Sequence, residues 1–172
     1  RPTLPKALAT PLERFLALLD QWNRTHALTA LAPGVRREEL LVDAAALLPH
    51  LDQLPSGGRV VDLGTGMGVP AVVLALARPD LTVIGVDASS KKMAFLRQVI
   101  LELSIPNLQA QQGRLESLPC LDADWGTAKA LGPLDQLVGW WSRHARPGAP
   151  FFALKGVEWE KEPLPAGWLG DR

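Results

Sequence analysis

Three glycines and two acids in the middle of the chain could together hold a small ligand. Gly64, Gly66 and Gly68 follow an apolar run that includes Asp62, in the segment VVDLGTGMGVP. A glycine turn between a strand and a helix lets a ligand approach the backbone closely. Asp87 closes the next apolar run, 23 residues after Gly64, where an acid can bind the two hydroxyls of a ribose. The spacing predicts a nucleoside ligand, and the alternative is that Asp87 only caps the helix that follows it.

The position of the third glycine decides between two classes of nucleoside ligand. The dinucleotide fingerprint is G-x-G-x-x-G, but its last position here is Val69, and the third glycine comes one residue early. S-adenosylmethionine is a nucleoside without a pyrophosphate, and its amino-acid end carries an ammonium and a carboxylate. Asp62 could bind that ammonium directly or through water, while N–H groups at the helix start bind the carboxylate. Leu115-Glu116 follows the third strand, where a class I methyltransferase contacts the adenine. We therefore expect S-adenosylmethionine rather than a dinucleotide.

The elements that must position these residues follow from the spacing of the apolar side chains. This spacing predicts two helices ahead of the glycine turn, over 11–23 and 37–50. After the turn, short β-branched runs alternate with helical patterns, which is typical of a parallel sheet with right-handed crossovers. The strands are expected over 59–63, 81–86, 107–111, 125–128 and 151–154, and the later helices over 70–77, from a cap at Ser89 or Ser90 to 103, and over 134–141.

The order of these elements predicts an α/β fold. We expect a doubly wound, mostly parallel Rossmann-like sheet of the class I methyltransferase type, with helices on both faces and an N-terminal helical extension. One domain over 1–172 would comprise a helical part, 1–55, a cofactor-binding core, 56–156, and an irregular tail, 157–172. Such sheets usually have one or two further strands, so C-terminal strands are expected to be missing. The start without Met predicts a chain trimmed at its N-terminus.

The composition excludes several classes of protein. Hydrophobic residues make up 47% of the 172 residues, which fits a globular domain. Eighteen basic residues balance 18 acidic ones, which argues against a protein that coats nucleic acid through charge alone. The one cysteine, Cys120, excludes an internal disulfide and a multi-thiolate metal site, and we interpret it as a small buried residue. No apolar run is long enough to span a membrane. We expect a cytoplasmic protein without a metal, and nothing requires more than a monomer.

Several longer stretches are similar to one bacterial enzyme family. They are LLDQWNRTHALTAL (18–31), VVDLGTGMGVPAVVLALARPDLTVIGVDASSKKMAFLRQVILEL (60–103), GRLESLP (113–119), TAKALGPLDQLVGWW (127–141) and FFALKG (151–156). The glycine turn followed by a proline, the DASSKKMAFLR helix and the ALKG strand end are specific in combination. With these stretches, the chain resembles the bacterial 16S ribosomal RNA guanine-N7 methyltransferases (RsmG, formerly GidB).

The resemblance implies a reaction, a cofactor and a partner. The reaction would be methyl transfer from S-adenosylmethionine to N7 of a guanine in 16S ribosomal RNA, at position 527 in standard ribosomal RNA numbering. The partner would be 16S ribosomal RNA within the small ribosomal subunit or its precursor. The family's cofactor positions would fall on Gly64, Val69, Leu115, Glu116 and Lys129, and its ribose acid on Asp87.

Three departures from the family pattern concern the substrate side of the site. Where the family has a His and then an Asp-Ser pair in the second helix, this chain has Leu40, Asp43 and Ala44. The arginine of the family's S-R-A segment is Lys129, which keeps the charge but loses the planar fork needed for bidentate contacts. The N-L-T segment reads Ala27-Leu28-Thr29. These changes could weaken substrate positioning.

Methylation at guanine N7 requires alignment from the protein rather than proton transfer. N7 carries a free lone pair at neutral pH, so no proton has to be removed before it attacks, and we assign no catalytic residue. Alignment of the reacting atoms can supply several kcal/mol of the barrier. The three histidines, which we interpret as packed or solvated, are His26, His50 and His144. The candidate substrate-positioning residues are Asp43, Lys129 and Lys155.

Basic side chains could hold the RNA. N7 lies in the deep groove of an RNA helix, so a loop or a splayed-out base is the accessible target. The available basic residues are Arg36-Arg37, Lys91-Lys92, Arg97, Arg143, Arg146 and Lys155. Scattered solvated charge is the alternative interpretation of this set. With a net charge of zero, RNA binding is expected to depend on the ribosomal subunit.

Three other functions stay open at this point. An NAD-binding oxidoreductase is disfavoured by Val69, which occupies the place of the third fingerprint glycine. A catalytically weakened, methyltransferase-like protein that binds RNA or the ribosome would account for Leu40, Ala44 and Lys129. A methyltransferase that acts on a small molecule or on another RNA would have the same cofactor site.

Overall fold

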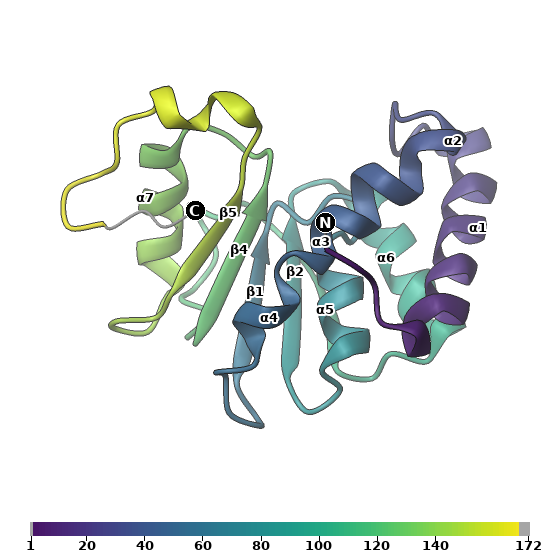
Figure 1. The fold of residues 1–172 in the computed structure, drawn as a ribbon, viewed down its shortest axis with the longest axis horizontal. Coiled ribbons are helices and arrows are strands. Elements are labelled where there is room, and N and C mark those ends of the chain that lie inside the picture. The colour runs from purple at the N-terminus through teal and green to yellow at the C-terminus, as the bar shows by residue number, and fades with distance from the viewer. Residues whose placement is uncertain (1, 169–172) are drawn as a thin grey trace.

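A five-stranded sheet forms the centre of the protein (Figure 1). The computed structural model describes residues 2–168. All neighbouring strands are parallel, in the order β3-β2-β1-β4-β5. Their bounds are β1 Arg59–Leu63, β2 Thr82–Asp87, β3 Leu108–Gln112, β4 Trp125–Lys129 and β5 Phe151–Leu154. The predicted parallel α/β sheet is confirmed, and β4 ends one residue later than expected, so that Lys129 stands at its carboxyl end.

Helices cover both faces of this sheet, as predicted. α5 Ala71–Ala77 and α6 Ser90–Leu103 lie on one face, together with α1 Ala9–His26, and α7 Leu134–His144 lies on the other (Figure 1). Crossovers of this kind keep the carboxyl ends of parallel strands at the same edge. Ser89 caps α6, because its hydroxyl oxygen accepts a hydrogen bond from the Lys92 amide.

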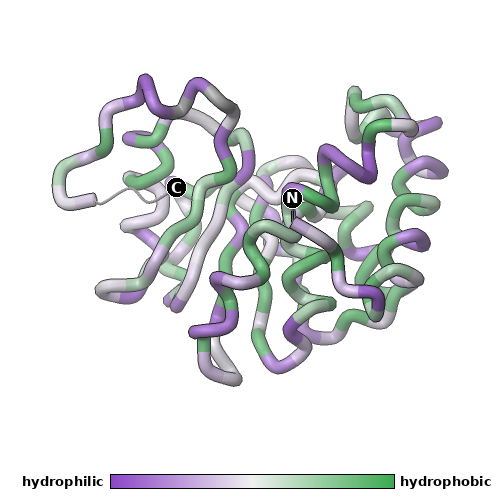
Figure 2. Tube along the Cα trace, in the orientation of Figure 1, coloured by the Kyte–Doolittle hydropathy of each residue, from purple (hydrophilic) through white to green (hydrophobic). Residues whose placement is uncertain are grey.

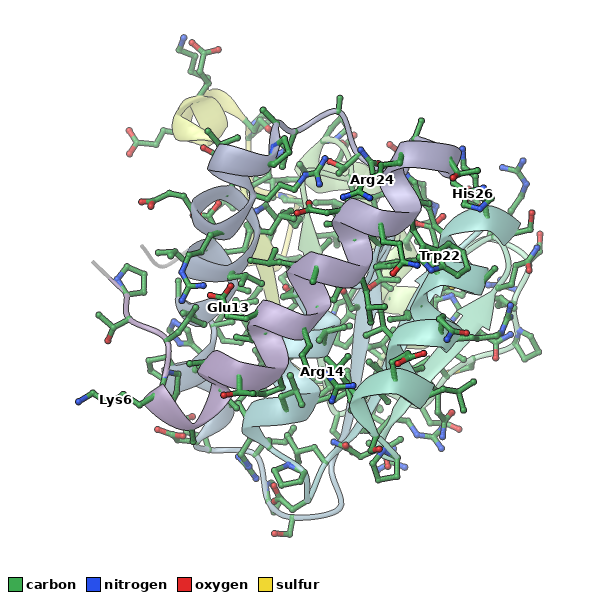
Figure 3. The ribbon with its side chains drawn as sticks, turned by 90° about the vertical axis from the view of Figure 1, so that its right-hand side faces the viewer. Lys6, Glu13, Arg14, Trp22, Arg24 and His26 are labelled. Carbon is green, nitrogen blue, oxygen red and sulfur yellow. The ribbon has the colours of Figure 1, made fainter. Side chains whose placement is uncertain are left out.

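The N-terminal helix α1 packs on α6 rather than directly on the strands. Trp22 and Phe15 both contact Phe95 of α6, with ring centroids 5.6 and 6.0 Å apart. Arg14 adds a hydrogen bond of 2.7 Å to the carbonyl of Glu102 at the far end of α6. Figure 3 shows α1 from the outside, with Arg14 near one end and Trp22 near the other. The apolar face of α1 therefore packs on α6, and α1 forms a further layer outside the sheet and α6.

The single helix expected over 37–50 is instead a broken helical segment. It comprises α2 Pro33–Arg36, the π-helical η2 Arg37–Val42, α3 Asp43–Ala45 and, after a turn, α4 Leu48–Leu51. Pro49 has no N–H to continue the preceding helix, whereas a proline is well tolerated in the first turn of α4. The remaining described elements are two short 3₁₀ helices, η1 Lys6–Leu8 and η3 Val157–Lys161.

The two faces of the sheet have separate apolar cores, as β5 illustrates. Phe152 stacks on Trp125 with ring centroids 4.9 Å apart, whereas Phe151 stacks on Trp141 at 5.3 Å. Successive side chains of a strand point to opposite faces, so one strand contributes to both cores. A Cβ on Gly126 would lie 2.2 Å from the Trp141 ring, so the close approach of α7 requires glycine there. Figure 2 shows hydrophobic stretches alternating with hydrophilic ones along the helices that flank the sheet.

Cys120 is exposed, which corrects its interpretation as a small buried residue. It lies in the connection between β3 and β4, where no helix or strand covers the thiol. Its Sγ stands 3.6 Å from Oδ1 of Asp122. Within residues 2–168, no helix combines the length and the apolar character that crossing a membrane demands.

Candidate functional site

The carboxyl ends of β1, β2 and β4 meet at one edge of the sheet. The register places Leu63, the last residue of β1, beside Val86 of β2 and Ala128 of β4. Asp87 and Lys129 follow on their strands, and the glycine turn follows Leu63, so all three lie at this edge. The chain order reverses between β1 and β4. In open α/β sheets, ligands bind at the carboxyl edge beside such a reversal.

The turn after β1 is held by the acid that ends β2. Asp87 Oδ2 accepts a hydrogen bond from the Gly66 amide at 2.9 Å, and its Oδ1 accepts one from the Ser89 amide at 2.9 Å. The Thr65 amide also donates to the carbonyl of Val86 at 2.8 Å. The hydroxyl of Ser89 caps α6, and the contact of Asp87 with the Gly66 amide lies outside that helix. The half-buried Asp87 carboxylate joins the glycine turn to the start of α6.

The three glycines of the turn have different surroundings. A Cβ on Gly64 would lie 2.4 Å from a methyl group of Leu131, and one on Gly68 would lie 2.6 Å from Leu96. At these two positions a side chain would collide with a leucine of the protein itself, and the positive φ of both residues, +64° and +106°, favours glycine. Gly66 has a φ of +60°, and no atom lies within 4 Å of an added Cβ. The open side of the turn is therefore at Gly66, next to the Asp87 carboxylate.

Asp62 is fully buried beneath the turn. Its Oδ2 accepts hydrogen bonds from the Thr65 hydroxyl at 2.6 Å and from the Ala71 amide at 3.2 Å. Its Oδ1 has no hydrogen-bond partner among the described residues. Burial raises the pKa of this carboxyl to about 7, the nearby charge of Asp87 adds to the rise, and the two hydrogen bonds oppose it. A cation beside Oδ1 would stabilise the ionised form.

The residues predicted to contact an adenine lie in the turn that follows β3. Leu115 is buried at 8% exposure, and Glu116 is exposed. The Gly113 amide donates to the backbone carbonyl of Asp87 at 3.0 Å, which ties this turn to the carboxyl end of β2. The structure thus brings the adenine candidates and the ribose acid to the same edge of the sheet.

Two of the three substrate-positioning candidates contact each other. Lys129 Nζ forms an ion pair with Asp43 Oδ2 at 3.2 Å and also donates to the backbone carbonyl of Glu39. The Lys129 side chain is 22% exposed and that of Asp43 is 53% exposed. This contact attaches the broken N-terminal helical segment to the end of β4. Leu40 and Ala44, the other two departures in that segment, are buried in the core.

Lys155 has partners of its own and is not joined to the Asp43–Lys129 pair. Its Nζ donates to the carbonyl of Gly132 at 2.8 Å and forms an ion pair with Glu162 at 2.7 Å. Glu162 also accepts a hydrogen bond from the Leu134 amide, and the contact with Lys155 lowers the pKa of its carboxyl. Lys155 therefore connects the end of β5 to the start of α7 and to the tail.

Some polar contacts at and near this edge were not anticipated from the sequence. Thr65 donates a hydrogen bond to Asp62 and follows it by three residues, and that spacing is a signal that the sequence offers.

The structure also places the three histidines and one of the basic residues. His144 is packed, with no exposed surface, whereas His26 and His50 are exposed. Arg36, expected among the basic residues for RNA, is buried and paired with Asp20, which removes it from that set.

Curated relatives align with most of this chain. Ribosomal RNA small subunit methyltransferase G of Xanthomonas euvesicatoria is 38% identical over 170 residues, which cover 96% of this chain and 78% of the relative. The protein of the same name from Chromobacterium violaceum is 40% identical over 152 residues, which cover 85% of this chain and 69% of the relative.

Solved structures have the same fold at low sequence identity. A Methanococcus maripaludis protein described as an S-adenosyl-L-methionine-dependent methyltransferase matches with a TM-score of 0.59 at 16% identity, over 70% of this chain and 58% of that one. Geranyl diphosphate methyltransferase matches with a TM-score of 0.56 at 23% identity, over 63% of this chain and 42% of that one. These likenesses confirm the predicted methyltransferase-type fold.

The family comparison spans nearly all of the chain. Residues 9–165 match the family described as rRNA small subunit methyltransferase G (GidB). The match, with the relatives above, confirms the predicted family, the methyltransferase class of enzyme and S-adenosylmethionine as the cofactor. The chain therefore belongs to the rRNA small subunit methyltransferase G family.

Proposed function

We propose that this chain transfers the methyl group of S-adenosylmethionine to N7 of a guanine in 16S ribosomal RNA. Family membership supports small-subunit ribosomal RNA as the substrate. The observation that carries the cofactor site is the hydrogen bond between the Gly66 amide and the Asp87 carboxylate, because it places an open glycine turn beside an acid at the carboxyl edge of the sheet. A nucleoside with a charged amino-acid end fits that arrangement.

The side chains at this edge fit such a methyl donor. Gly66 leaves open space where a Cβ would stand, so a ligand can lie against the backbone. Asp62 has a buried oxygen without a partner in the described chain and a raised pKa, which suits an ammonium placed directly, or through water, beside it. We assign Asp87 to the ribose and Leu115-Glu116 to the adenine. The full set of proposed cofactor contacts is Asp62, Gly64, Gly66, Gly68, Val69, Asp87, Leu115, Glu116 and Lys129.

The proposed reaction needs no general base from the chain. When bound, S-adenosylmethionine supplies a methyl group activated by a positively charged sulfonium. N7 attacks with its own lone pair, so the chain's contribution is to hold the base in line with that methyl group. The methylated base becomes positively charged, and a carboxylate nearby would stabilise it. Asp43 is our candidate for that carboxylate, because it is half exposed and Lys129 holds it at the sheet edge.

We further propose that the substrate is the small ribosomal subunit or its precursor, and that the chain acts as a cytoplasmic monomer. The 18 basic and 18 acidic residues give no excess charge with which to hold free RNA. The described structure also removes Arg36 from the basic residues available for RNA, and Arg146 is paired with Asp124. Contacts with a folded ribosomal particle would supply the binding energy that charge alone does not.

A methyl-transfer assay tests this proposal. Labelled S-adenosylmethionine is incubated with the chain and with small subunits from cells that lack the modification, and the RNA is digested and analysed by mass spectrometry. We expect labelled 7-methylguanosine in 16S ribosomal RNA, with less label in naked RNA than in subunits. Binding of S-adenosylhomocysteine without transfer would favour the weakened binding protein, and label in another RNA or a small molecule would identify a different substrate. Tight binding of NADH alone would support the oxidoreductase.

A further inference from the structure

A buried histidine at the end of α7 holds the turn that follows β3. His144 has no exposed surface, and its Nε2 lies 2.7 Å from the carbonyl oxygen of Leu115. A carbonyl oxygen can only accept, so Nε2 carries the hydrogen and donates it. Nδ1 is then the acceptor nitrogen, and it is buried without a partner in the described chain. An unpartnered buried nitrogen costs stability, so packing alone gives no reason for a histidine here.

The neighbouring arginine holds the other end of the same turn. Arg143 donates from Nε and Nη2 to the carbonyl of Leu118, at 3.3 and 3.2 Å. The turn between these two attachments closes on itself, because the amide of Leu118 donates to the carbonyl of Arg114 at 3.0 Å. The end of α7 is itself fixed, since the carbonyl of His144 accepts a hydrogen bond from the Ala123 amide at 2.9 Å. Two adjacent residues of α7 thus fix the turn 114–118.

The attachment at Leu115 sets the direction of the next amide. In a trans peptide the C=O of one residue and the N–H of the next point in opposite directions. Because His144 binds the carbonyl of Leu115, the N–H of Glu116 points away from the buried ring. That N–H donates to no described residue. It belongs to a turn that the Gly113 amide ties to Asp87, the proposed ribose acid.

We propose that His144 is a positioning residue for the base of the methyl donor. By holding the Leu115 carbonyl, it directs the Glu116 N–H toward a ring nitrogen of the adenine. The proposal rests on the proposed function, in which Leu115 and Glu116 contact that base. His144 acts through the backbone of Leu115, and it belongs to α7, which lies on the face of the sheet away from α5 (Figure 1).

Calorimetric titration of the full chain with S-adenosylhomocysteine tests this role. We expect His144→Leu to weaken binding about tenfold, the equivalent of one lost hydrogen bond, with kcat at saturating donor changed less than twofold. His144→Gln keeps a donor at a similar reach and should restore the affinity to within about threefold of wild type. The control is Leu51→Ala, in the core on the other face of the sheet, which should lower the melting temperature without changing this affinity.

Deaza analogues separate positioning from a general loss of structure. S-adenosylhomocysteine is prepared with N1 or N3 of the adenine replaced by C–H. We expect the wild-type chain to bind one of the two analogues about tenfold more weakly than S-adenosylhomocysteine itself. With that analogue, the affinity of His144→Leu should be less than twofold below that of the wild-type chain. Equal weakening of all ligands by His144→Leu, or a His144→Gln variant as weak as His144→Leu, would overturn the proposal. If the wild-type chain binds S-adenosylhomocysteine and His144→Leu binds it with the same affinity, the role of His144 is overturned but the proposed function is not. If the wild-type chain binds none of these ligands, the proposed function is overturned as well.

Discussion

The Asp87 carboxylate accepts a hydrogen bond of 2.9 Å from the backbone amide of Gly66, so the acid that ends β2 holds the turn that follows β1. A second hydrogen bond, from the Ser89 amide, ties the same carboxylate to the start of α6. The proposed ribose acid is therefore fixed before a ligand arrives. Side chains that are oriented in advance lose less freedom on binding, which favours affinity.

Replacing Asp87 with asparagine should weaken the binding of S-adenosylhomocysteine by about 10- to 100-fold, because hydrogen bonds to a charged group contribute about 1.5–3 kcal/mol. The amide also offers a donor where the Gly66 or Ser89 N–H requires an acceptor. Calorimetric titration measures the loss. Asp80→Asn is the control, because Asp80 precedes β2 at the other end and is paired with Arg78. Equal losses in the two variants would contradict the assignment of Asp87 to the ribose.

The open side of the glycine turn gives a second prediction. Gly66→Ala meets no protein atom within 4 Å but places a methyl group where the ligand is proposed to lie. We expect a stability loss of about 1–2 kcal/mol from the left-handed backbone and a loss of S-adenosylhomocysteine affinity of more than about tenfold.

Gly57 offers a matched control for this substitution. Its φ is +83°, and an added Cβ there also meets nothing within 4 Å, but it lies in the loop before β1. Gly57→Ala should lower the stability by a similar amount and leave the affinity unchanged. If Gly66→Ala bound the ligand as well as Gly57→Ala does, the space at Gly66 would not be the cofactor site. Thermal melts and titrations of both variants decide the question.

The sheet and the glycine turn could be predicted because their signals are local. Five strands were expected and found, because a buried strand is a short apolar run between turns in the sequence. β1 and β5 have the predicted bounds. Asp87 and Gly66 could be linked because parallel strands bring their carboxyl ends together. The break near Pro49 was missed although proline marks it, because the apolar spacing continues across it.

Contacts between distant parts of the chain could not be read from the sequence. Asp43 and Lys129 are 86 residues apart, and only the folded chain shows that they pair. The same holds for His144 and Leu115, which join α7 to the turn after β3. The burial of Cys120 was predicted wrongly, because a lone cysteine is usually buried whereas this one lies in an uncovered loop.

The pair of Lys129 and Asp43 gives a third prediction. Lys129→Met should lower kcat/KM for methyl transfer about tenfold or more, because the charge-assisted contacts proposed between Lys129 and the methyl donor contribute about 1.5–3 kcal/mol. The free energy of unfolding should change by less than about 1 kcal/mol, because the Lys129–Asp43 pair is partly exposed to water. Lys129→Arg keeps the charge and should stay within about threefold of wild type. Steady-state kinetics and urea denaturation measure both quantities. Asp43→Asn should also lower kcat/KM, because Asp43 is our candidate for the carboxylate beside the methylated base. A kcat/KM in Lys129→Met within about twofold of wild type would contradict the role assigned to the lysine.

The raised pKa of Asp62 predicts how stability depends on pH. Between the ordinary value of 3.8 and the folded value of about 7, the folded chain binds more protons than the unfolded chain. The Asp62 carboxyl therefore makes its full contribution to the free energy of unfolding below pH 3.8. This contribution, roughly 4 kcal/mol, is lost as the pH rises through about 7. In urea denaturation without ligand, Asp62→Asn should remove most of this fall, because the amide does not titrate, and should be the more stable chain at pH 8. Asp52→Asn, which makes the same substitution at an exposed aspartate, is the matched control. An unchanged slope in Asp62→Asn would mean that this carboxyl is ionised in the folded chain well below pH 7.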